Sequence, residues 1–362
     1  MSTFDRNAAV YSMRRFWRCM PWLAACLFCG LASAATLPLQ IVHRIVVQGA
    51  APVRAIVPGP GGTQVYVASG REIRVYDVAT GSLAGTLPLP APVLDMTADD
   101  SAGVGYAALA APARVVVFGL QPLRITSTIG LTDGAPSALL LDAATHALYV
   151  ESAAGASLAK FDTASGKRVA ALRLQGALRQ MATDGRGTLY VANMSHAAID
   201  AVDTARMTRT GAIPLDDCTD PTGLALDPVG RRLFVACRDG GRAVVDTDLG
   251  FTFQQLSGHV HGAVRTVFGF RPFGASSWKG GAFSAGDAPQ LTAIRMNAFI
   301  SYSAAGTYPL DGRCEALALD TGGRGLWLAV APVSAAGSQA GAPVELRLLS
   351  ATAPIEAAGA SK

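Results

Sequence analysis

The stretch TGLALDPVGRRLFVACRDGGRAVVDTDLG, residues 222–250, contains three apolar runs separated by turn-forming residues. Asp227 and Pro228 end the first run, the second is centred on Phe234, and a glycine-rich turn separates it from the third, which ends at Asp246. Short runs of β-branched, aromatic and aliphatic residues bounded by Asp, Gly and Pro are typical of strands joined by tight turns. The stretch therefore predicts consecutive short β-strands.

Variants of this stretch recur along the chain. Its second run returns as QVYVAS, GVGYAAL, ALYVES, TLYVAN and GLWLAV, centred on Tyr66, Tyr106, Tyr149, Tyr190 and Trp327. The centres from Tyr66 to Phe234 are 40 to 44 residues apart, and the 93 residues between Phe234 and Trp327 leave room for two units, one of them degraded. A period of about 40 residues with four apolar segments per unit is typical of a β-propeller blade.

The number of units and the two ends of the repeat predict how the ring closes. Units open near Val53, Val93, Ser137, Leu178, Thr222, Ala263 and Glu315. The last unit has three strands, at 315–319, 325–330 and 343–349, and one additional strand at 39–49 precedes the first unit. Pairing these ends would hide two open sheet edges. We predict an all-β, seven-bladed β-propeller of four-stranded antiparallel blades over residues 38–350, closed by the N-terminal strand and followed by a disordered tail, 351–362.

The first 34 residues have the order of a secretory signal peptide. Arg14, Arg15 and Arg18 precede the apolar stretch 20–31, and Ala32-Ser33-Ala34 follows it. We expect cleavage after Ala34 and a periplasmic or secreted protein whose mature form has no transmembrane span, because the apolar stretch is too short to cross a bilayer. The tetrapeptide Leu23-Ala24-Ala25-Cys26 offers an alternative, a lipoprotein anchored through Cys26.

Loss of the leader changes both the charge and the cysteine count. It removes four arginines and one aspartate, which lowers the net charge from +4 to +1. No basic stripe remains for a phosphate backbone, so we expect no nucleic-acid partner. Cys218, Cys237 and Cys314 remain, and an odd count in an oxidising compartment suggests one pair and one spare thiol. Cys218 and Cys237 lie at the two ends of one predicted hairpin, so we expect a disulfide between them.

The tetrapeptides YVAS, YVES and YVAN and the unit opening Pro221–Asp227 resemble the YVTN β-propeller repeat family. The resemblance covers residues 38–350 and implies an exported bacterial seven-bladed propeller, similar to the lactonase-like YVTN superfamily. It is specific for the fold and poorly specific for function, because lactonases, quinone enzymes, haem d1 enzymes and binding proteins have similar blades.

Functional residues are expected where a unit departs from the repeat, because the recurring Tyr, Asp and Gly serve the scaffold. Polar departures gather in the loops that a propeller places on one face, around the mouth of its channel. We expect the ligand or partner face to comprise Asp133, Glu151, Asn193, His196, Asp217, Asp220, Arg238, His259, His261 and Arg313.

The pattern of these residues favours binding over catalysis. His259 and His261 alternate with Val260 and would share one side of an extended segment, so they are the candidate metal ligands; no other cofactor is predicted. No nucleophile elbow, H-E-x-x-H motif, paired CxxC or phosphate loop occurs, so no catalytic residue is assigned. We predict a monomeric, non-enzymatic binding or scaffold protein for a protein or small-molecule ligand. The alternatives are a periplasmic accessory protein of a redox or metal/quinone system and a lactonase-like hydrolase.

Overall fold

The computed structural model describes residues 36–49, 51–152, 156–216, 218–256, 265–270, 281–296, 302–332 and 343–351. All of them belong to one structural unit, Ala34–Lys362. The predicted signal peptide, 1–34, and residues 352–362 of the predicted tail lie outside the described residues.

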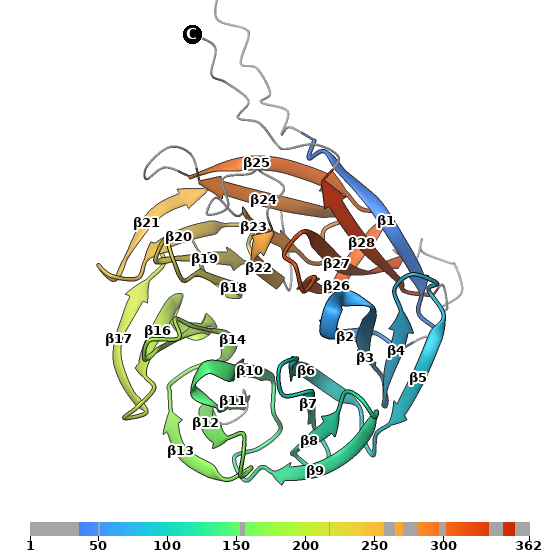
Figure 1. The fold of residues 1–362 in the computed structure, drawn as a ribbon. Helices are drawn as coiled ribbons and strands as arrows, with labels where there is room; N and C mark the ends of the chain where they lie inside the picture. Colours follow the sequence, from blue (N-terminus) through green and yellow to red (C-terminus); the bar gives the residue numbers. More distant parts are fainter. Residues whose placement is uncertain are drawn as a thin grey trace, which may run out of the picture. The chain divides into compact units, whose positions relative to one another are not determined.

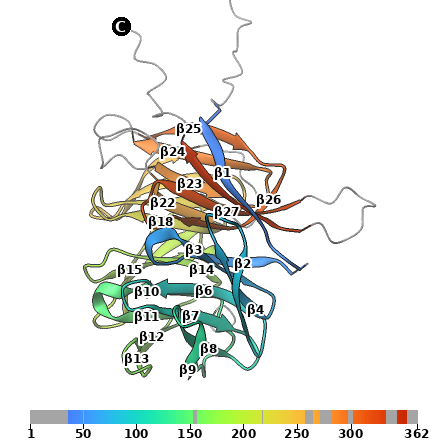
Figure 2. The same ribbon diagram turned by 45° about the vertical axis from the view of Figure 1, so that its right-hand side comes forward.

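The described strands form seven four-stranded antiparallel sheets, which confirms the predicted fold class. The first six sheets follow chain order: β2 (Val53–Pro58), β3 (Gln64–Ser69), β4 (Glu72–Asp77) and β5 (Leu83–Pro88) form blade 1; β6 (Val93–Asp99), β7 (Val104–Leu109), β8 (Arg114–Gly119) and β9 (Arg124–Gly130) form blade 2; β10 (Ala138–Asp142), β11 (Ala147–Ser152), β12 (Ser157–Asp162) and β13 (Arg168–Arg173) form blade 3. Blade 4 has β14 (Leu178–Thr183), β15 (Thr188–Asn193), β16 (Ala198–Asp203) and β17 (Thr208–Pro214); blade 5 has β18 (Pro221–Asp227), β19 (Arg232–Cys237), β20 (Arg242–Asp246) and β21 (Phe251–Leu256); blade 6 has β22 (Arg265–Phe270), β23 (Gly281–Ala285), β24 (Gln290–Met296) and β25 (Tyr302–Pro309). Figure 1 shows the blades arranged around a common axis, with the first strand of each nearest the centre, and Figure 2 shows the same ribbon turned by 45°.

The seventh sheet joins the two ends of the repeat, as predicted. Its order is β1 (Leu39–Val46), β28 (Glu345–Ala351), β27 (Gly325–Pro332) and β26 (Gly312–Leu319), so the N-terminal strand supplies the outermost position. β1 runs antiparallel to β28, with Ile45 opposite Leu346. Just before β1, the amide of Leu37 donates to the carbonyl of Thr307 in blade 6 at 2.8 Å. The N-terminal segment therefore completes blade 7 and also contacts blade 6 (Figure 1).

Ion pairs and buried side chains hold this closure together. Arg347 of β28 is bonded to Asp311 at 2.6 Å and to Glu345 at 2.8 Å, and Arg44 of β1 reaches the same Glu345 at 3.2 Å. Ile45 of β1 is 2% exposed, whereas its neighbour Val46 is 53% exposed. Successive strand residues face opposite sides, so one side of β1 packs into the core and the other faces solvent.

The recurring aspartates cap turns, as the repeat predicts. The turn after the first strand of a blade is held by Asp142, Asp184, Asp227 and Asp320, whose side-chain oxygens accept backbone N–H bonds of 2.8 to 3.3 Å from residues of the same turn. An aspartate side chain can satisfy these amides locally, which shortens the turn between two strands.

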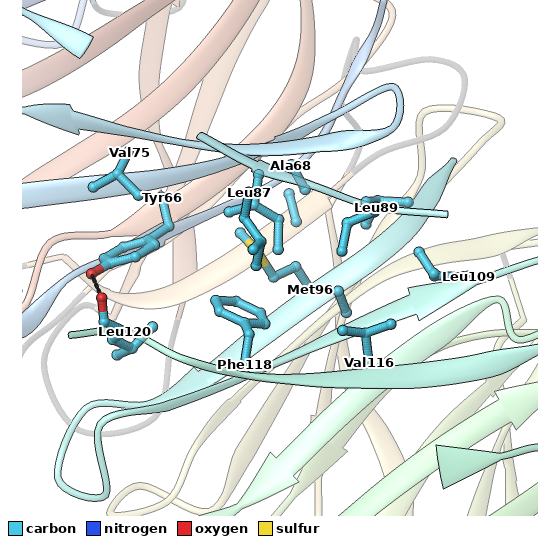
Figure 3. Close-up of a cluster of buried hydrophobic side chains, with 14 of the residues drawn as sticks. Tyr66, Ala68, Val75, Leu87, Leu89, Met96, Leu109, Val116, Phe118 and Leu120 are labelled. Atoms are coloured by element: carbon cyan, nitrogen blue, oxygen red, sulfur yellow. Dashed lines mark hydrogen bonds between the residues drawn. The ribbon is translucent and has the colours of Figure 1, made fainter. Parts of the chain in front are cut away.

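The recurring aromatic residues pack between neighbouring blades. Figure 3 shows Tyr66 of blade 1 and Phe118 of blade 2 in one buried cluster, together with Leu87 and Met96. The Tyr66 hydroxyl donates to the carbonyl of Leu120 in the next blade at 3.0 Å. Tyr66 thus contributes apolar area and a directional bond across the blade boundary.

Helical structure in the described residues is confined to the short 3-10 turns Pro60–Gly62, Ala143–Thr145 and Met194–His196. Among the described residues, no helix has the length and apolar character needed to cross a membrane.

The closure makes a prediction that two adjacent residues of β1 can test. Ile45→Ala should lower the free energy of unfolding by about 2 to 5 kcal/mol, because it empties a buried site in the closing strand. Val46→Ala, on the solvent side of the same strand, should change it by less than about 0.5 kcal/mol. Urea unfolding of both variants measures the difference, and equal effects would show that β1 does not pack as described.

Candidate functional site

A cavity of about 600 Å³ lies where the first strands of the blades converge, and all seven blades contribute to its wall. This cavity is here called the hub cavity. Its charged lining consists of four arginines and three acids: Arg54, Arg179, Arg238, Arg313, Asp95, Asp287 and Glu315. A volume of this size is within the range of small-molecule sites, and the charged lining makes it suited to polar ligands.

Irregularities in the first strands shape this wall. The register against the second strand slips between Val53 and Ala55, between Leu178 and Met181, and between Cys314 and Ala316, and similar slips occur in β6 and β18. A bulge adds a residue that the neighbouring strand does not pair, and it redirects side chains near binding sites. Cavity-lining residues that fall within these slips include Arg54, Arg179 and Glu315.

Three side chains on the wall link neighbouring blades. Asp95 of blade 2 accepts the Leu139 amide at 2.8 Å, and Gln180 of blade 4 accepts the Leu224 amide at 2.7 Å. Glu315 of blade 7 accepts the Val53 amide at 2.7 Å, which joins the last blade to the first at their inner ends. The first strand of a blade has an open backbone edge toward the channel, and these bonds satisfy part of it. Two of the three wall acids are therefore engaged in holding the ring.

The wall arginines differ in their partners. Arg313 donates to Glu315 at 2.9 Å, and Arg238 is paired with Asp220 at 3.1 Å. Within the described residues, the hydrogen bond that Arg179 makes is from its Nε to the Sδ of Met194, at 3.0 Å. A thioether is a weak acceptor, so the guanidinium of Arg179 keeps most of its donor capacity for other groups.

Glu151 lies behind this wall and departs from the repeat. Its Oε1 accepts a hydrogen bond from Ser137 at 2.9 Å, and Ser137 lines the hub cavity. The residue is fully buried, and its Oε2 has no hydrogen-bond partner among the described residues. The pKa of Glu151 is raised to about 8, because burial, with a smaller contribution from Asp95, outweighs the lowering by Ser137 and Arg179. Glu151 is therefore mostly protonated at neutral pH.

The structure separates the predicted face residues into three groups. Arg238 and Arg313 line the hub cavity, Asp220 is paired with Arg238, and Glu151 lies one hydrogen bond behind the wall. The remaining described members lie elsewhere: Asp133, Asn193 and His196. Asp217, His259 and His261 lie outside the described residues.

Two of the residues away from the cavity have local structural roles. Asn193 is 1% exposed, and its Nδ2 donates to the carbonyl of Gln175 and to Asp200, both at 2.7 Å, so it fixes the loop that leads into blade 4. Asp133 is paired with Arg168 at 2.8 Å beside a second cavity of about 150 Å³. His196 is exposed in the turn Met194–His196.

Sequence reasoning missed most of the hub cavity. Arg54, Asp95 and Arg179 belong to first strands, whereas the predicted face consists of residues expected in loops. One sequence signal could have revealed these three residues. When the first strands are aligned, the three residues lie just before the segment that pairs with the recurring aromatic. The residue type in this part of the strand changes from blade to blade.

Cys218 and Cys237 are joined by a disulfide with their Cα atoms 5.5 Å apart, and both are fully buried. The bridge ties the loop before β18 to the end of β19, next to the Asp220–Arg238 pair. Cys314 is buried, and its thiol donates to the carbonyl of Ala316 at 3.2 Å. No group of three or more metal-ligating side chains occurs within the described ranges, and the candidate ligands His259 and His261 lie outside them.

Comparisons with known proteins show the fold and leave the family open. No family model and no curated protein matches the chain. The solved structure described as "Structure of U3-55K" is 13% identical with a TM-score of 0.69, over 84% of this chain and 98% of that one. The "Crystal structure of RRP9 WD40 repeats" is 14% identical with a TM-score of 0.70, over 86% of this chain and 99% of that one. This chain therefore has a seven-bladed β-propeller fold with WD40-repeat proteins among its structural neighbours.

The buried carboxyl of Glu151 predicts a pH-dependent stability difference. The unfolded chain ionises Glu151 near its ordinary pKa of 4.5, whereas the folded protein keeps it protonated up to about pH 8. Wild type should therefore lose stability relative to Glu151→Ala as pH rises through this window, by about 1.4 kcal/mol per pH unit at most, and the difference should be constant below it. Urea unfolding at pH 4 and pH 8 measures the change, and a stability difference that is equal at both values contradicts the burial of Glu151.

The disulfide predicts a measurable loss on reduction. Cys218→Ser combined with Cys237→Ser should lower the free energy of unfolding by about 3 kcal/mol, because the bridge closes a loop with a sequence separation of 19 residues. Exposure of wild type to dithiothreitol should give a similar loss and should have little further effect on the double variant. Sensitivity of the double variant equal to that of wild type would contradict this assignment.

Proposed function

We propose that this chain is an exported bacterial binding protein of the YVTN-repeat type, without enzymatic activity, that holds a protein segment or a small ligand at the hub cavity. The observation that carries the proposal is the composition of the cavity wall. The blades repeat one another at scaffold positions, yet at the wall they supply arginines, acids, Gln180 and Ser137 in no repeating order. Side chains that vary within a repeating scaffold, and that converge on one cavity, favour recognition of a ligand.

Export is supported by two features besides the leader sequence. A buried disulfide at Cys218–Cys237 suits an oxidising compartment. The closing segment makes its first described contact at Thr36, which pairs with Thr307, so cleavage after Ala34 would leave the closure complete. Membership of the YVTN family rests on the tetrapeptides YVAS, YVES and YVAN and on the Pro221–Asp227 opening.

The alternatives from the sequence remain hypotheses with narrower support. A metal or quinone accessory role depends on His259 and His261, which lie outside the described residues. A lactonase-like hydrolase would need acids free to hold a cation, and at the hub cavity Asp95 and Glu315 already accept backbone amides.

The proposal predicts that partner capture depends on the hub cavity. Immobilised mature protein should retain one or more components of an envelope extract, and Arg238→Glu combined with Arg313→Glu should reduce their retention at least tenfold by reversing charge at the wall. Arg186→Glu is the matched control, because Arg186 is exposed in the turn between β14 and β15, at the other end of the strands. Quantitative mass spectrometry of the eluates measures retention. Retention that is equal for both charge reversals, or absent for wild type, contradicts the proposal.

A further inference from the structure

Glu151 occupies a position that the other clear repeats give to alanine. It lies two residues after the recurring aromatic, where blades 1, 2, 4, 5 and 7 have Ala68, Ala108, Ala192, Ala236 and Ala329. Those alanines show that the scaffold works without a polar group at this position. A fully buried carboxyl with one oxygen unpartnered among the described residues costs stability, so the fold alone gives no reason for it.

The groups that face Glu151 come from three blades. Ser137, just before β10, donates to Oε1; Arg179 of β14 and Asp95 of β6 act on its charge from either side. All three of these residues line the hub cavity. Glu151 is therefore linked to the wall of the hub cavity through Ser137 and is not an isolated buried residue.

The charges in this cluster favour an anionic group. Asp95 already accepts the Leu139 amide, and Glu315 accepts the Val53 amide and pairs with Arg313. Arg179 is exposed and bonded to a thioether, and a protonated Glu151 adds no negative charge near it. An ammonium ligand would be repelled by the charge of Arg179, whereas an oxyanion would accept hydrogen bonds from its guanidinium.

We propose that the hub cavity binds the carboxylate group of a ligand, with Arg179 as its charged partner beside the neutral Ser137–Glu151 pair. The inference rests on the proposed binding function and specifies its chemistry. The carboxylate can belong to a free organic acid or to the C-terminus of a peptide, since both present the same two oxygens to the guanidinium.

The arrangement couples binding to the proton on Glu151. Ionised Glu151 would repel a carboxylate, so binding should weaken as pH rises above about 8, the value to which burial raises the pKa of this group. Coupling to one proton limits the loss to about tenfold per pH unit. Glu151→Gln cannot ionise, and it should keep its affinity across the same range.

Isothermal titration of the purified mature protein tests the inference with three probes: succinate, trialanine with a free C-terminus, and trialanine amide. We expect succinate, free trialanine or both to bind at pH 7. If free trialanine binds, its amide should bind at least tenfold more weakly. Arg179→Ala should weaken the binding of each carboxylate at least tenfold. Between pH 7 and pH 9 wild type should lose about tenfold in affinity, and Glu151→Gln should lose less than twofold. Binding of succinate alone identifies a free acid, and binding of trialanine alone identifies a peptide terminus.

Three results would overturn the inference: binding of neither carboxylate, equal affinity for peptide and amide where the peptide binds, or unchanged binding by Arg179→Ala. Thermal unfolding of Arg179→Ala and Glu151→Gln verifies that both variants are folded. Retention of envelope components can depend on Arg238 and Arg313 and yet be unaffected by Arg179→Ala. That result would contradict the carboxylate site and leave the proposed binding function in place.

Discussion

The open backbone edge of the last blade is the constraint on which the rest of the molecule depends. The strands β26, β27 and β28 would end in a row of unpaired amide and carbonyl groups, and β1 covers that row from the other end of the chain. An uncovered edge is costly and prone to association. The bond from the Val53 amide to Glu315 closes the same junction at its inner end, so the first and last blades are joined both at the rim and beside the hub cavity.

Closure is also what creates the site. The arginines of the wall are far apart in the sequence, from Arg54 to Arg313, and only a ring brings them to one cavity. Wall acids such as Asp95 link one blade to the next while contributing negative charge to the lining. The wall carries four arginines against three acids, and two of these acids also accept backbone amides from the neighbouring blade.

Sequence periodicity predicted the scaffold well because its physical causes are local. The alternation of apolar runs, the capping aspartates such as Asp227 and the filling aromatics such as Tyr66 are all visible within one unit. The site was predicted less well. Bulges at Arg54 and Arg179 depend on how two strands pair, and no residue pattern within a single strand indicates them. Asn193 is polar and departs from the repeat, yet it serves a loop, because polarity alone does not distinguish a buried structural bond from a binding contact.

Hydrogen exchange of the strand pair that closes the ring tests the central claim most directly. In the intact protein the amides of 345–351 should exchange as slowly as those of β12, since both strands have a partner on each side, and the amides of 39–46 should be protected like those of the outer strand β13. Rapid exchange throughout 39–46, together with edge-like exchange in 345–351, would show that the two ends of the chain do not pair and that the ring is open.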